Sequence, residues 1–290
     1  LWTEEQLAAY TIRYYAEYDN YNGGEADKGG MLASHYGAGG DTFFFDDMAT
    51  DNATTRSSNN RYVPGLWLVG QSKGDWNFTN IYALNYYLQT VVPRLEAGEL
   101  TGGETNVKHY VGEGYFLRAH EYFYRLRRLG DFPIVTETLP DEQEALVEAS
   151  KRRPRNEVAR FILSDLDKAI ALLTNEPPGG KVRITKNAAL LLKARVALFE
   201  ATWEKYHAGT ANVPNGPGWP GAGKDYNANY TFPSGSLDGE ITFFLTEAMD
   251  ASAQVADALS LVNCLSFMIR LTRERRLQAG PRSFGREDEP

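Results

Sequence analysis

Four aspartates near the start of the chain are the side chains best suited to chemistry: Asp41, Asp46, Asp47 and Asp51. Two carboxylates facing each other can hydrolyse a glycosidic bond, and carboxylate oxygens are also the ligands that Ca²⁺ prefers. The calcium-loop spacing D-x-[DN]-x-[DN]-G is not met. A solvated acidic loop is therefore the simplest interpretation, and both Ca²⁺ binding and hydrolysis stay open as alternatives.

Histidine and cysteine do not form a recognisable metal or nucleophile site. The histidines are His35, His109, His120 and His207, and no two of them are four residues apart. The single cysteine, Cys264, lies in no known catalytic motif, and a G-x-S-x-G elbow is absent. We therefore predict no catalytic residues, no metal site and no cofactor, and we expect that the protein is not an enzyme.

A glycine triplet, Gly216, Gly218 and Gly221, matches the G-x-G-x-x-G spacing of dinucleotide-binding turns. Pro217 and Pro220 remove backbone donors from it, and neither a preceding strand nor a following helix is indicated. We conclude that it holds no nucleotide. The net charge of -8 also argues against nucleic acid as a partner, because phosphate binding requires a basic face.

Apolar residues at helical spacing dominate the rest of the chain. In residues 155–173, for example, Val158, Ile162, Leu166 and Ala169 fall on one face. Residues 134–136 are the main candidate for an extended segment. Trp76, at the start of a predicted helix, is expected in the core. The predicted helices span residues 3–18, 75–97, 104–129, 155–173, 185–206 and 239–260.

Short turns join the second predicted helix to the third and the fourth to the fifth, which is typical of stacked helix–turn–helix pairs. Gly, Asn, Asp, Ser and Pro dominate two long stretches, residues 20–75 and 207–239, and indicate irregular loops. The sequence therefore predicts a mainly α fold of tetratricopeptide-like (TPR-like) pairs with long loops, although the tetratricopeptide signature itself is absent.

Three ordered segments resemble the SusD/RagB family. They are GEGYFLRAHEYFYRLRRLGDFPIV at 112–135, RRPRNEVARFILSDLDKAIALL at 152–173 and GKVRITKNAALLLKARVALFEATW at 180–203. The run DWNFTNIYALNYYL at 75–88 is similar to the preceding family helix. The resemblance covers residues 1–262 and leaves residues 263–290 as an atypical tail. We expect that this tail reflects truncation or a frameshift, and that a lipid anchor lies upstream.

The resemblance implies a surface-exposed lipoprotein of the outer membrane in a Bacteroidetes-like bacterium. Such proteins bind glycans, or sometimes peptides, for a SusC-like TonB-dependent transporter, and they lack catalysis. The alternative is a TPR-like protein–protein scaffold with no ligand site of its own. A glycoside hydrolase using the cluster from Asp41 to Asp51 is a third, weaker alternative.

Sugar rings stack their apolar faces on aromatic side chains, while polar groups take the hydroxyls. The chain is rich in such side chains, with 17 tyrosines and 5 tryptophans. A tryptophan in a Gly- or Pro-rich loop is costly to expose without a purpose, which favours Trp67 and Trp219. The residues predicted to bind the ligand are Trp67, Trp219, Tyr226, Tyr230, Asp51, Asn60 and Arg61.

Overall fold

The computed structural model describes residues 1–15, 76–180 and 182–258. Within them the chain is helical, with two isolated β-bridges and no longer strand. The helices are α1 (Glu4–Ile12), α3 (Thr79–Glu96), α4 (Glu104–Leu129), α5 (Gln143–Ala149), α6 (Arg155–Leu172), α7 (Lys186–Tyr206) and α8 (Leu237–Ala256), with short 3-10 turns at Pro220–Gly223 and Asp225–Asn227.

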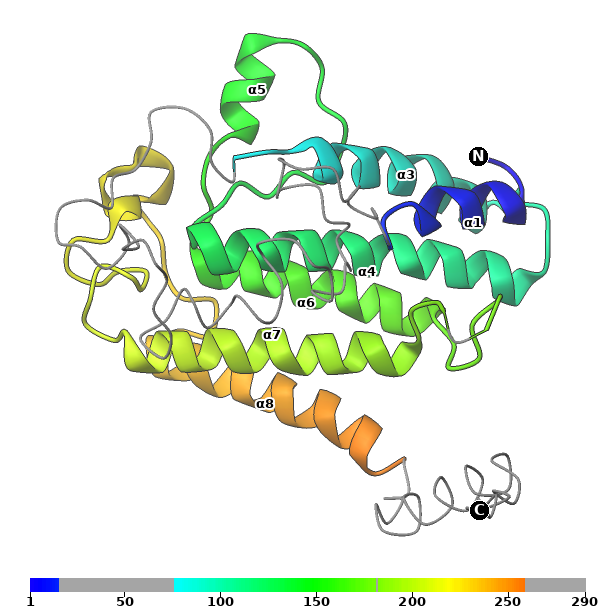
Figure 1. Ribbon diagram of the computed structural model, residues 1–290. Helices are drawn as coiled ribbons and strands as arrows, with labels where there is room; N and C mark the ends of the chain where they lie inside the picture. The colour runs from blue at the N-terminus through cyan, green and yellow to red at the C-terminus, as the bar shows by residue number, and fades with distance from the viewer. Residues whose placement is uncertain (16–75, 181, 259–290) are drawn as a thin grey trace, which may run out of the picture.

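The long helices form one stack in which each packs on its neighbour in the order α3, α4, α6, α7, α8 (Figure 1). Helix α1 lies against α4 beside α3, and α5 stands apart from the stack. The prediction of a mainly α, TPR-like fold is confirmed, with α3–α4 and α6–α7 as the expected pairs. No helix in the described part of the chain combines the length and apolarity that crossing a bilayer requires.

Local sequence signals account for the helix boundaries. Thr3 accepts a hydrogen bond from the Gln6 backbone and closes a capping box at the start of α1. Thr185 caps α7 in the same way, through the Ala188 N–H at 3.1 Å. The apolar stripe of α6 is buried as predicted, because its spacing keeps those side chains on one face of the helix.

Glycine allows α3 and α4 to approach closely. A Cβ on Gly114 would lie 2.6 Å from the ring of Tyr87, too close for any side chain. Tyr87 is fully buried there, and its hydroxyl donates to the Tyr110 carbonyl at 3.0 Å. The absence of a side chain at position 114 therefore sets the distance between these two helices.

The structure differs from the prediction at several helix ends, in one additional helix and at Trp76. Helix α1 ends at Ile12, and α3 begins at Thr79 rather than at residue 75. Helix α5 was not predicted, because none of its residues is buried and it carries no apolar stripe. Trp76 is 44% exposed rather than in the core: its ring stacks on Phe132, and the guanidinium of Arg152 lies 4.4 Å from the ring centre.

Candidate functional site

A groove of about 280 Å³ separates α3 from α5 and from the chain segment before α5. Its walls are largely apolar, which suits a ligand with flat apolar faces. The lining residues are Phe78, Ile81, Tyr82, Asn85, Val135, Glu137, Leu139, Leu146, Ala149 and Ser150.

Two exposed aromatic side chains lie on α3, the helix that forms one wall of this groove. Tyr82 and Tyr86 are 57% and 49% exposed and lie one turn apart on α3, so both rings emerge on the same side of the helix. Large aromatic side chains left in water on one helix face are available for stacking a ligand. Of the two, Tyr82 lines the groove, and Tyr86 lies one helical turn further along α3.

Side chains from the core hold the groove wall that residues 134–138 form. The amide of Asn85 donates to the carbonyls of Val135 at 2.8 Å and Glu137 at 3.3 Å. The Tyr122 hydroxyl donates to the Val135 carbonyl and accepts from its N–H. Residues 134–136 belong to no strand, and side chains take up the backbone hydrogen bonds of Val135 that a neighbouring strand would take up in a sheet.

Arg118, on the buried side of Asn85, fixes the orientation of the Asn85 side chain. This buried guanidinium donates to the Asn85 side-chain oxygen at 3.0 Å and to the Thr136 carbonyl at 3.4 Å. Because the oxygen of Asn85 is held by a cation, its nitrogen is free to donate to the wall. Buried hydrogen bonds therefore hold the groove wall in place, and the side chains of Asn85 and Arg118 behind it already have partners.

The second loop, residues 207–239, packs onto the stack, and this corrects the expected exposure of Trp219. The indole is 4% exposed, and its N–H donates to Asp131 at 2.8 Å. Gly221 makes this fold possible, since a Cβ there would lie 2.2 Å from the indole. Trp219 is therefore packed inside the protein, and its ring offers no free face for a ligand.

The two tyrosines predicted with Trp219 have internal partners as well. The Tyr230 hydroxyl donates to the Asn156 side chain at 2.8 Å, and burial raises the pKa of Tyr230. Tyr226 is partly buried, with the ammonium of Lys151 5.9 Å from its ring centre. The other predicted ligand residues, Trp67, Asp51, Asn60 and Arg61, lie outside the described residues, as does the aspartate cluster.

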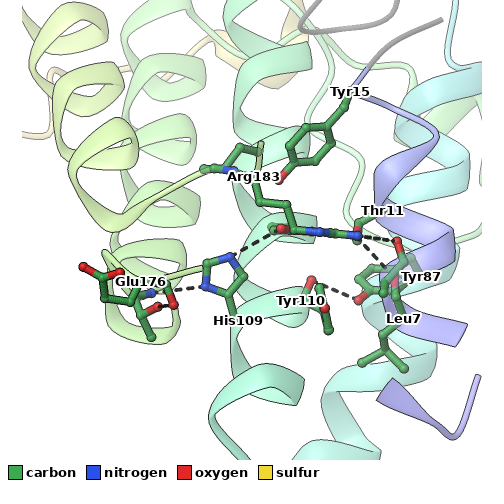
Figure 2. A network of polar contacts seen from close by, with 12 residues as sticks. Leu7, Thr11, Tyr15, Tyr87, His109, Tyr110, Glu176 and Arg183 are labelled. Atoms are coloured by element: carbon green, nitrogen blue, oxygen red, sulfur yellow. Dashed lines mark hydrogen bonds and ion pairs between the residues drawn. The ribbon is translucent and has the colours of Figure 1, made fainter. Parts of the chain in front are cut away.

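A buried polar network joins α1, α4 and the segment before α7 (Figure 2). Glu113 accepts hydrogen bonds from Thr11 and Arg183, each at 2.6 Å. Burial alone would raise the pKa of Glu113, but the His109 ring nitrogen 3.4 Å away, the hydrogen bond from Thr11 and the charge of Arg183 outweigh it and lower the pKa. His109 accepts the Thr174 N–H at 3.2 Å, which directs its other ring nitrogen toward Glu113. The network is enclosed and serves the fold.

A second buried cluster gathers three glutamates between α6, α7 and α8. Arg155 pairs with Glu200 through two hydrogen bonds of 2.8 Å, and Arg160 pairs with Glu240. Glu204 is fully buried, and neither of its oxygens has a hydrogen-bond partner. Burial, with the charges of Glu200 and Glu240, raises the pKa of Glu204 to about 9, so it keeps its proton at neutral pH.

The described residues contain no group of three or more His, Cys, Asp or Glu side chains placed to hold a metal ion. Of the features in this part of the chain, the α3–α5 groove is the one that combines an apolar hollow with exposed aromatic rings. Sequence reasoning missed it because Tyr82 and Tyr86 lie within a predicted helix, where an aromatic ring is expected to be buried. Their spacing of four residues was the available signal.

Residues 29–198 match a family model described as SusD-like_3, starch-binding associating with outer membrane. The chain is similar to SusD-like protein P2 of Formosa agariphila, with 33% identity over 73 residues that make up 25% of this chain and 14% of that protein.

Two solved structures are also similar in sequence to parts of the chain. A SusD-like protein from Bacteroides fragilis is 31% identical, with 43% of this chain and 23% of the other covered and a TM-score of 0.36. A SusD homolog from Bacteroides thetaiotaomicron is 25% identical, with the same coverage and a TM-score of 0.34. The match thus spans less than a quarter of the length of each of these relatives.

Proposed function

The chain belongs to the SusD-like family described as starch-binding and associated with the outer membrane, and from this we propose that it binds glycans at the bacterial cell surface. The family model matches more than half of the 290 residues. The observation that carries the proposal is the pair of exposed tyrosines, Tyr82 and Tyr86, beside an apolar groove. Sugar rings stack on such side chains, and their hydroxyls stay in water or bind the polar rim.

The proposal extends to delivery and location. The bound glycan passes to a SusC-like TonB-dependent transporter, and the protein sits on the outer membrane through a lipid anchor upstream of this sequence. It acts by binding, without catalysis. The family resemblance supports these points, and each has its own test: co-purification with a SusC-like transporter, lipid labelling of the full-length protein, and a reducing-sugar assay for hydrolysis.

Calorimetry with maltoheptaose, an α-glucan fragment of starch, tests glycan binding directly, with an array of neutral oligosaccharides as a wider screen. Replacing Tyr82 or Tyr86 with alanine should weaken affinity about five- to thirtyfold each, because a stacked aromatic at a binding surface contributes about 1–2 kcal/mol.

Tyr206→Ala is the matched control, since Tyr206 is 76% exposed and does not line the groove. Its affinity should equal that of the wild type. Failure of the unmodified chain to bind any glycan of the array would contradict the proposed function. Full binding by the Tyr82→Ala, Tyr86→Ala double variant would contradict the placement of the site in this groove.

A further inference from the structure

Glu137 provides the one charged side chain among the residues that line the α3–α5 groove. Its backbone carbonyl is held by Asn85 at 3.3 Å, so the residue has a fixed position on the wall. The side chain is exposed, and within the described residues its carboxylate makes no ion pair. Glu137 therefore brings to the groove wall a negative charge that no cation among the described residues pairs with.

The surroundings add negative charge and do not cancel it. Asp141, at the entrance of α5, lines a second hollow on the same helix, and Glu144 lies in its first turn. The nearby cations have other partners: Lys151 pairs with Glu148, and Arg153 pairs with Glu157 at 2.6 Å.

Arg152, the remaining cation of this run, lies over the ring of Trp76, 4.4 Å from its centre. Glu137 thus lines the groove, Asp141 and Glu144 lie near it on and before α5, and the cations of residues 151–153 are paired or stacked on other side chains. An anionic ligand in the groove would be repelled by Glu137, and because this carboxylate is exposed, dissolved salt would screen the repulsion.

Resting on the proposed function, we propose that Glu137 determines charge selectivity in this groove, so that it accepts uncharged or amine-bearing glycans and rejects glycans that carry uronate or sulfate groups. The aromatic rings contribute affinity for any sugar with an apolar face. Glu137 decides which of those sugars can enter.

A matched ligand pair tests the selectivity. Maltoheptaose and its counterpart oxidised to carboxylate at C6 have the same linkage and length, but the first is uncharged and the second is anionic. The unmodified chain should bind the neutral form at least about tenfold more tightly in low salt. This preference should shrink at high ionic strength, because salt screens charges at an open site.

Glu137→Gln should improve affinity for the oxidised ligand about fivefold, the change expected for removing one like charge near a surface, and should leave maltoheptaose within about twofold. Glu137→Lys should reverse the preference. Glu99→Gln is the control, because it removes an exposed carboxylate beyond the end of α3, outside the groove, and makes the same change in net charge.

Equal binding of both ligands by the unmodified chain would overturn the selectivity while leaving glycan binding intact. Equal effects of Glu137→Gln and Glu99→Gln would show that only net charge matters, and would overturn the role of Glu137. If the unmodified chain binds neither ligand nor any glycan of the array, the proposed function itself fails and the selectivity fails with it.

Discussion

Arg118 on α4 and Asp165 on α6 form a buried ion pair joined by two hydrogen bonds, from Nε at 2.7 Å and from Nη2 at 2.9 Å. The same guanidinium reaches Asn85 on α3. One side chain thus connects three neighbouring helices of the stack and supports the groove wall that Asn85 holds. Both partners come from the segments that carry the family resemblance, which gives those segments a physical role.

Replacing Arg118 with alanine should therefore destabilise the fold by about 3–5 kcal/mol, because the buried Asp165 carboxylate loses both hydrogen bonds and keeps only the half-exposed ammonium of Lys168, 3.6 Å away, as a counter-charge. Urea denaturation measures this change. Lys108→Ala removes an ion pair from the exposed face of α4 and should have no measurable effect. A small loss of unfolding free energy for Arg118→Ala would show that water or a neighbouring cation replaces the guanidinium.

Glu204→Gln should stabilise the protein on the order of 2 kcal/mol at pH 7. The pKa of Glu204 rises from 4.5 to about 9 on folding, so the unfolded state releases this proton first as pH increases. The natural chain is therefore most stable, relative to Glu204→Gln, below pH 4.5, and its stability declines as pH rises toward 9.

The difference between the natural chain and Glu204→Gln should accordingly grow with pH across that range in thermal or urea unfolding. Glu200→Gln is the contrasting variant, because it weakens the doubly bonded pair with Arg155 and should destabilise at neutral pH. A pH-independent difference for Glu204→Gln would mean that Glu204 is ionised in the folded protein.

Trp219→Ala should lower stability by about 2–4 kcal/mol, as expected for emptying a packed aromatic site, and should leave glycan affinity unchanged. Trp219→Phe keeps a ring but loses the bond to Asp131 and should cost about 1 kcal/mol. If Trp219→Ala lost glycan affinity but kept the stability of the natural chain, the result would contradict the burial of this indole.

Trp67 stays a predicted ligand residue outside the described part of the chain. Trp67→Ala should weaken binding of the cognate glycan more than about tenfold if its ring stacks on a sugar. Unchanged affinity in calorimetry would remove Trp67 from the site. Together with Tyr82→Ala, this variant shows whether the first loop and the α3–α5 groove act on the same ligand.

Gly114→Ala should destabilise by about 1–3 kcal/mol, although alanine is the better helix former. The added methyl group would overlap the Tyr87 ring at 2.6 Å. Gly223→Ala is the control, because a Cβ there meets nothing within 4 Å. A neutral result at position 114 would show that α3 can shift away from α4 at little cost.

The helical stack could be predicted because its signals are local. The apolar stripe of α6 and the caps at Thr3 and Thr185 each require only residues within a few positions of one another. Helix α5 carries no such stripe, and its charge-rich surface resembles a loop. Helix α3 begins at Thr79 and not at residue 75, and its N-cap residue, Phe78, makes no side-chain capping bond that the sequence could have signalled.

The candidate site was harder to predict because it depends on contacts between distant segments. The buried indole of Trp219 donates a hydrogen bond to Asp131, which lies 88 residues away in the sequence. Tyr82 and Tyr86 are exposed because the neighbouring α5 segment lines a groove beside α3 and does not cover them. Residue type gave the capacity for stacking, but tertiary packing decided which rings face water.

The network around Glu113 also fixes an order of events during synthesis. Helix α1 is held by Arg183, which donates to the Ala8 carbonyl and the Thr11 hydroxyl across 175 and 172 residues of sequence. These bonds cannot form until residue 183 has been synthesised and has left the ribosome. A nascent chain that stops before that point therefore holds α1 only through contacts with α3 and α4, such as Tyr10 with the Ala83 carbonyl and Glu4 with Asn106.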